Sequence, residues 1–160
     1  MSVKLETAYH EAGHIVLAWF SKYHTIAGGI DLTKGSGQIP EIAVSKSKMS
    51  AAKKLPSKDT ASNDNDVVRE AAVIFTAGYQ AELLAASINR SLAPDRGSAD
   101  LDYQIVDAVL TNAGLQWDMR LAEAAADDLL RRHWVWVEKI AQRAFERRRL
   151  TVEDLIDIFP

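Results

Sequence analysis

The chain has 160 residues, enough for one domain with a single hydrophobic core. Its residues are 48% hydrophobic and 26% charged, as in an ordinary globular protein, and a net charge of −3 gives no reason to expect nucleic-acid binding. The lack of cysteine excludes disulfides and thiolate metal ligands. The longest apolar run, Ile15–Phe20, is too short to cross a bilayer, so we expect a cytoplasmic protein with no membrane span.

The first predicted helix, from about Leu5 to Tyr23, contains the pattern H-E-x-x-H. Residues four apart lie on one face of a helix, so His10 and His14 can bind the same metal ion. Glu11 is rotated by about 100° from His10 and can face a water molecule on that metal. The alternative is a surface helix with two solvated histidines, but the apolar run that follows indicates a largely buried helix. The pattern therefore favours a metal site suited to hydrolysis.

A β-hairpin is predicted after this helix. Two segments with strand character, 25–33 and 38–45, are separated by the turn signal Lys34-Gly35-Ser36-Gly37. Pro40 cannot donate to a sheet, which places the second strand at an edge. The following segment, 46–64, is polar with few large apolar residues, so we expect a flexible loop beside a cleft.

Four further helices are predicted from apolar residues that recur three and four positions apart. They cover about 66–89 with Asp64 or Asp66 as N-cap, 98–112 with Ser98 as N-cap, 118–149, and a last short helix through Ile158 behind the capping box Thr151–Asp154. Within 98–112 the predicted apolar stripe is Leu101, Ile105, Ala108 and Val109. The expected fold is one α+β domain over 1–160, mainly helical, with a small antiparallel sheet beside the H-E-x-x-H helix and a long C-terminal helix.

The third metal ligand must be a histidine or a carboxylate. An extended H-E-x-x-H-x-x-G-x-x-H pattern would need a histidine at position 20, which is phenylalanine, and His133 lies on an apolar stripe typical of a core histidine. The acidic candidates are Glu70, Glu82, Asp95, Asp100, Asp102 and Asp107. Glu82 has small and apolar neighbours, which predicts burial, and Asp100 lies in the first turn of its helix. Spacing alone leaves Glu82 and Asp100 equal.

The order of the motifs resembles the peptidase domain of FtsH-type zinc metalloproteases. The resemblance consists of His10–His14, the Gly-rich hairpin, Ala77-Gly78-Tyr79-Gln80-Ala81-Glu82 and Gly97-Ser98-Ala99-Asp100-Leu101, and it extends to the last two helices. It implies Zn²⁺ bound by His10, His14 and Asp100, with Glu82 hydrogen-bonded to a ligating histidine. No G-x-x-x-x-G-K-[ST] loop occurs in the chain, so no ATP binding is expected.

The predicted function is that of a zinc-dependent endopeptidase acting on extended or unfolded polypeptides, with Glu11 as general base. The substrate backbone would pair with the second strand, near Gly37, Gln38 and Ile39. The alternative is a zinc-binding regulatory or adaptor domain without catalysis, acting through its long C-terminal helix. Trp134 and Trp136 on that helix would then be exposed, whereas packing roles would make them core residues. Self-association into a homo-oligomer through this helix is a further alternative.

Overall fold

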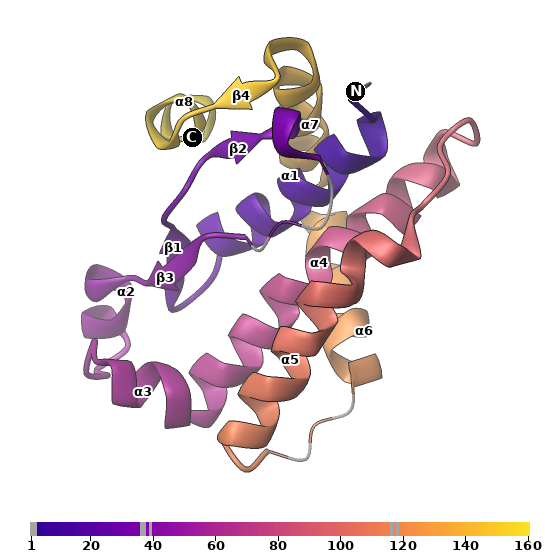
Figure 1. Ribbon diagram of the computed structural model, residues 1–160. Coiled ribbons are helices and arrows are strands. Elements are labelled where there is room, and N and C mark those ends of the chain that lie inside the picture. Colours follow the sequence, from indigo (N-terminus) through magenta and orange to yellow (C-terminus); the bar gives the residue numbers. More distant parts are fainter. Residues whose placement is uncertain (1–2, 36–37, 39, 116, 118) are drawn as a thin grey trace.

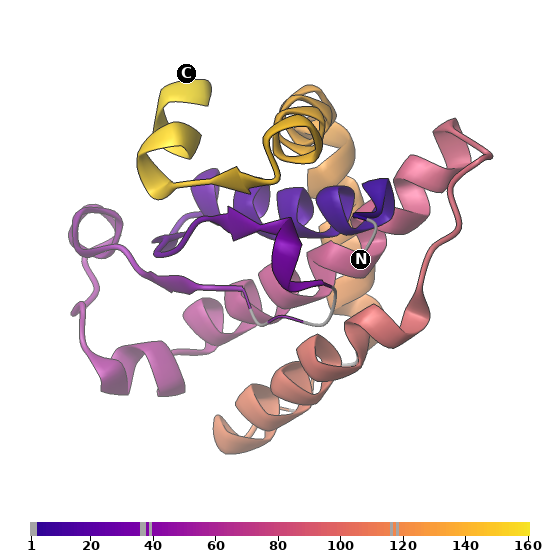
Figure 2. The same ribbon diagram turned by 45° about the horizontal axis from the view of Figure 1, so that its top comes forward.

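The computed structural model describes residues 3–35, 38, 40–115, 117 and 119–160. Its elements form a helical body with two small antiparallel sheets at one side (Figures 1 and 2). In chain order they are α1 (Leu5–Trp19), β1 (His24–Ile26), β2 (Ile30–Asp31), η1 (Leu32–Lys34), β3 (Ile42–Val44), α2 (Lys46–Ala51), α3 (Lys58–Asn63), α4 (Asn65–Ile88), η2 (Arg96–Ala99), α5 (Asp100–Asn112), α6 (Met119–Arg132), α7 (Trp134–Arg147), β4 (Arg149–Leu150) and α8 (Val152–Ile158). The predicted fold class, mainly helical α+β, is confirmed.

Helix α1 is the centre of the core, and it packs mainly against α4 and α7. Every residue from Ala8 to Ala18 is buried, as the unbroken apolar run predicts for a helix covered on all sides. The helix ends at Trp19, four residues earlier than predicted. It approaches α4 closely at Gly13, where an added Cβ would lie 2.7 Å from the carbonyl oxygen of Ala77. This close approach brings the histidines of α1 next to α4.

Helix α4 follows the predicted boundaries closely. The carboxylate of Asp64 accepts hydrogen bonds from the backbone N–H groups of Asp66 and Val67, which confirms Asp64 as the N-cap. By length and composition alone α4 could cross a membrane, but 67% of its most apolar 18-residue window is buried inside the protein. That burial is typical of the core helix of a globular domain.

The predicted antiparallel sheet is present beside α1, but the two strands do not form a simple hairpin. Strand β1 pairs with β3, and His24 lies opposite Val44. Between them the chain leaves this sheet, and β2 pairs with β4 near the C-terminus, where Ile30 lies opposite Leu150. Both of these last residues are buried, so the second sheet covers apolar surface that a local hairpin would leave exposed.

The segment predicted as a flexible loop, 46–64, forms the short helices α2 and α3 instead. Each begins at a serine: Ser45 accepts a hydrogen bond from the N–H of Lys48, and Ser57 accepts one from Thr60. Met49 of α2 is fully buried. Helices of six residues carry too few apolar positions to produce a recognisable period, which is why the sequence pattern missed them.

The C-terminal helical region predicted over 118–149 is divided into α6 and α7 at His133. The backbone there leaves the helical region (φ −114°, ψ 20°), and the imidazole stacks on Phe20 with ring centroids 4.1 Å apart. Trp134 stacks on Tyr9 of α1, and Trp136 packs against Phe20, so both tryptophans are half-buried packing residues. The two tryptophans that an adaptor function of this helix would expose are therefore packed against the α1 region of the same domain. The capping box before α8 is confirmed.

Candidate metal centre

Two imidazoles on α1 form the base of the site. His10 and His14 lie one turn apart on the same face of the helix, and their Nε2 atoms are 3.1 Å apart. Both side chains are buried, with exposed fractions of 2% and 0%. The predicted geometry of the H-E-x-x-H pattern is confirmed: both histidines aim the same ring nitrogen at one point.

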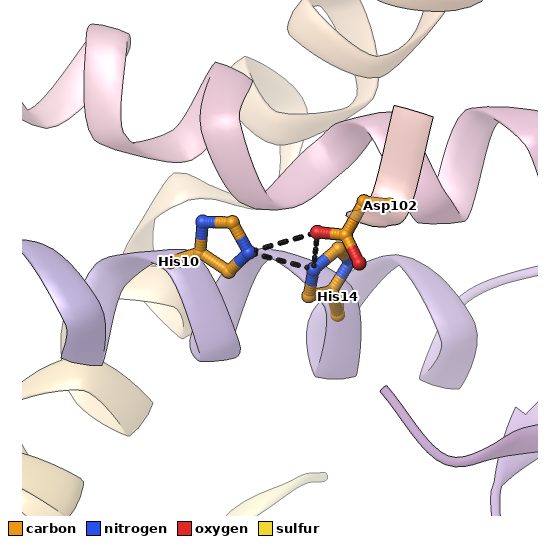
Figure 3. Close-up of side chains that lie close together, drawn as sticks. All are labelled: His10, His14 and Asp102. Carbon is orange, nitrogen blue, oxygen red and sulfur yellow. Dashed lines mark hydrogen bonds and ion pairs between the residues drawn. The ribbon is translucent and has the colours of Figure 1, made fainter. Parts of the chain in front are cut away.

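The third group at that point is Asp102, the third residue of α5 (Figure 3). Its Oδ2 lies 3.0 Å from Nε2 of His10 and 3.1 Å from Nε2 of His14. Ligand atoms about 2.0–2.1 Å from a tetrahedral metal ion are roughly 3.3 Å apart. The three atoms are thus spaced almost as the corners of such a coordination shell, and the group could hold a metal ion.

The residue that the structure brings to the two histidines is Asp102, whereas the family resemblance implied Asp100. Asp100 is the first residue of α5 and is exposed, and it does not belong to the cluster. The buried residues of α5 are Asp102, Val106 and Leu110, spaced four apart, whereas Leu101 of the predicted stripe is 38% exposed. The predicted stripe was shifted by one residue. An aspartate at the head of the alternative stripe was the signal that could have identified Asp102.

Hydrogen bonds on the far side of each ring fix the tautomers. Nδ1 of His14 lies 2.8 Å from the carbonyl oxygen of Ile74, and a carbonyl only accepts, so this nitrogen carries the proton. Nδ1 of His10 lies 2.7 Å from Oε2 of Glu82 and donates to that carboxylate in the same way. In the neutral rings each Nε2 therefore presents a lone pair. Two nitrogen lone pairs and a carboxylate oxygen converge, which is unfavourable without a proton or a cation between them.

Glu82 lies where the family resemblance implies, behind a histidine of the cluster. The side chain is only 2% exposed. Oε2 accepts from His10 and from the hydroxyl of Ser98, 2.8 Å away, while Oε1 accepts from the backbone N–H of Asp95 at 3.0 Å. A carboxylate held by three donors has a fixed position and orients the imidazole that donates to it.

The electrostatics of the cluster favour positive charge. Burial lowers the pKa of His10, but the hydrogen bonds to Asp102 and Glu82 outweigh burial and raise the pKa to about 10. Burial likewise raises the pKa of Asp102, but hydrogen bonds with the two histidines outweigh it, and the net pKa is lowered. Without a metal, a proton on His10 supplies the positive charge that the converging atoms require. A divalent cation would supply the same charge and displace that proton.

Glu11 lies beside the cluster and has one carboxylate oxygen to which no described residue donates. The residue is only 9% exposed, and its Oε1 has no hydrogen-bond partner among the described residues. Burial raises the pKa of Glu11, and the charges of His14 and His10 lower it by less. Oδ1 of Asp102 is likewise buried without a partner in the described part of the chain. Buried polar atoms of this kind indicate a missing ligand or water molecule.

Gly78 of α4 makes room for the imidazoles. A Cβ built on Gly78 would collide with Nε2 of both His10 and His14. Only glycine leaves the space into which the two nitrogens converge. This position belongs to the Ala77–Glu82 segment that carries the family resemblance, although its steric role emerges only from the packing of α1 on α4.

The remaining predicted site residues lie elsewhere or cannot be placed. Gly37 and Ile39 are outside the described residues, and the amide of Gln38 donates to the carbonyl oxygens of Asp31 and Gly35, so it stabilises its own turn. Glu70, one of the acidic candidates, pairs with His24 at 2.7 Å. Glu70 also accepts hydrogen bonds from the backbone N–H groups of residues 22–24, which makes the pair a structural feature.

Comparison with models of known protein families gave no match. Comparison with curated proteins gave no similar sequence either. The functional argument therefore depends on the geometry of the cluster formed by His10, His14 and Asp102.

Proposed function

We propose that this protein is a zinc-dependent endopeptidase whose metal is bound by His10, His14 and Asp102. The observation that carries the proposal is the convergence of two Nε2 lone pairs and one carboxylate oxygen, within 3.1 Å of one another. The tautomers that aim those lone pairs are maintained by Ile74 and Glu82. Two histidines and one carboxylate are a ligand set of catalytic zinc sites, which keep a fourth position for water.

Bound zinc would supply Lewis acidity, polarising a peptide carbonyl and making a water molecule acidic near neutral pH. Glu11 is the general base of the proposed mechanism. Its unpaired Oε1 accepts a proton from the attacking water, and the protonated carboxyl then donates that proton to the departing amine nitrogen. Burial raises the pKa of Glu11, which suits a group that must take up and release a proton near neutrality. The carbonyl oxygen of Ile74 and the carboxylate of Glu82 keep the two imidazoles oriented throughout.

The substrate in this proposal is an extended polypeptide. Strand β3 pairs with β1 on one side, and no described strand pairs with its other edge. An open edge can bind the backbone of an extended chain through main-chain hydrogen bonds, which gives little selectivity for side chains. The small sheet lies beside α1, the helix that carries both histidines. A preference for unfolded polypeptides follows from this mode of binding.

A metal-binding domain without catalysis is the second candidate, and burial favours it. His14 and Asp102 have exposed fractions of 0% and 1%, as expected of a metal that stabilises a fold. Glu11 favours catalysis, because a purely structural site has no use for a buried carboxylate beside the ligands. The two candidates share the metal and differ in whether Glu11 acts on a water molecule.

The deciding experiment measures zinc content and casein hydrolysis for wild type and Glu11→Gln. The proposal predicts zinc in both proteins and a loss of hydrolysis in the variant on the order of 10²–10⁴-fold. Glu6→Gln, on the same helix with the same change of charge, serves as the matched control and should cleave casein like wild type. Zinc without casein cleavage in the wild type would support the non-catalytic candidate. Unchanged cleavage by zinc-loaded Glu11→Gln would refute the assigned base.

A further inference from the structure

The hydroxyl of Ser98 lies behind the candidate metal centre. The residue belongs to η2 and is 5% exposed. The sequence predicted it as the N-cap of the next helix, but α5 begins after Ala99, which makes no side-chain cap. The Ser98 Oγ lies instead 2.8 Å from Oε2 of Glu82 and 2.7 Å from the carbonyl oxygen of Asp95. The hydroxyl of Ser98 therefore does not cap α5 and contacts Glu82 instead.

Glu82 connects this hydroxyl to the metal-ligating ring. The Oε2 atom that faces Ser98 also accepts the hydrogen bond from Nδ1 of His10. A hydroxyl has one proton, and an ionised carboxylate is a stronger acceptor than a peptide carbonyl. Ser98 therefore donates preferentially to Glu82 and limits the positions that Oε2 can adopt. The direction of the His10 lone pair depends on those positions.

The same turn also precedes the helix that presents Asp102 to the cluster. η2 leads directly into α5, and Asp102 is the third residue of that helix. The backbone N–H of Asp95 binds Oε1 of Glu82, and the hydroxyl of Ser98 binds Oε2. The carboxylate of Glu82 thus joins the segment that presents Asp102 to the imidazole of His10.

We propose that Ser98 is a positioning residue of the metal centre: its hydroxyl holds Glu82 so that His10 and Asp102 face the metal together. This inference rests on the proposed function, because it requires that the cluster binds a metal. The Oγ of Ser98 lies 2.8 Å from Oε2 of Glu82 and 3.4 Å from Nδ1 of His10, on the side of the ring away from the metal-facing Nε2. The proposal therefore adds a specific expectation: metal affinity depends on a hydroxyl that contacts none of the three atoms facing the metal. Loss of a partner behind a ligating histidine weakens metal binding by roughly 10–100-fold.

The test is a titration of the metal-free full chain with Co²⁺, followed by visible absorption, for wild type, Ser98→Ala and Ser98→Thr. We expect Ser98→Ala to bind Co²⁺ about tenfold more weakly and with an altered spectrum. Ser98→Thr keeps the hydroxyl and should recover most of the affinity. Ser87→Ala is the matched control, because its hydroxyl donates to the carbonyl oxygen of Leu84 at 2.6 Å within α4. Its Co²⁺ affinity should equal that of wild type.

A purely structural role would give a different result. Ser98→Ala would then lower the thermal stability of the metal-free protein and leave the Co²⁺ affinity and spectrum unchanged, which overturns the inference. If Ser98→Ala does not fold without metal, Ser98→Val takes its place with the same expectation, because it has the shape of Ser98→Thr and lacks only the hydroxyl. A wild-type protein that binds no Co²⁺ would refute the proposed function as well, whereas a wild type that binds Co²⁺ and a variant that equals it would refute the role of Ser98 alone.

Discussion

Replacing Asp102 with asparagine tests the geometry of the metal centre most directly. The substitution keeps the shape of the side chain and removes its charge. Oδ2 of Asp102 is one of three converging atoms, and the residue is 1% exposed, so solvent cannot replace the lost ligand charge. A change behind a ligand already costs up to about 100-fold in metal affinity. We therefore expect Asp102→Asn to lose at least that factor, or ~2.7 kcal/mol of binding free energy.

The matched control is Asp100→Asn. It changes the same residue type, two positions away on the same helix, with the same change of net charge, but its side chain is exposed. Zinc content after dialysis against a limiting chelator, measured by atomic emission, gives the readout for both variants. Circular dichroism of the metal-free proteins confirms that each is folded.

Asp102→Asn should emerge nearly free of zinc and Asp100→Asn fully loaded. The opposite pattern, with zinc lost from Asp100→Asn and retained by Asp102→Asn, would refute the assignment of Asp102 and restore the ligand implied by the family resemblance. Equal retention of zinc in both variants would show that the metal does not depend on the carboxylate of Asp102.

Three further predictions concern the surroundings of the site. Gly78→Ala should abolish tight zinc binding and destabilise the fold by about 1–3 kcal/mol, because the added Cβ collides with both imidazoles. Zinc and urea titrations measure the two effects. Gly97→Ala is the control, because its added Cβ would meet only Asp95, at 3.2 Å. The pKa of His10 is raised from 6.5 to about 10, so the stability that this proton contributes to the metal-free protein is complete below about pH 6.5 and is lost as the pH rises towards 10. Urea unfolding of the metal-free protein at increasing pH measures this loss. A free energy of unfolding that rises over the interval would contradict it. Glu70→Gln should cost about 1.5–3 kcal/mol in urea unfolding, since the carboxylate accepts bonds from His24 and the adjoining backbone, while zinc affinity stays unchanged.

The local elements were largely predictable because they depend on neighbours in sequence. The four-residue spacing of His10 and His14 requires only the period of a helix, and the capping box of α8 and the N-cap of α4 require only side chains within three residues. The short helices α2 and α3 were missed because six residues hold too few apolar positions to reveal a helical period. The break at His133 was also missed, because stacking on Phe20, which is distant in sequence, accompanies it.

The sequence by itself determined that His10 and His14 share one helix face, that Glu11 lies next to them in that helix, and that the fold is mainly helical, because each follows from residue type and helical period. Only the tertiary structure decided which carboxylate joins the two histidines. An α5 with apolar residues at both 101 and 106 can bury either of two adjacent faces, and the packing of α5 on α4 selects the face that carries Asp102. The tautomers of His10 and His14 likewise depend on acceptors 72 and 60 residues away, Glu82 and Ile74, which local sequence cannot specify.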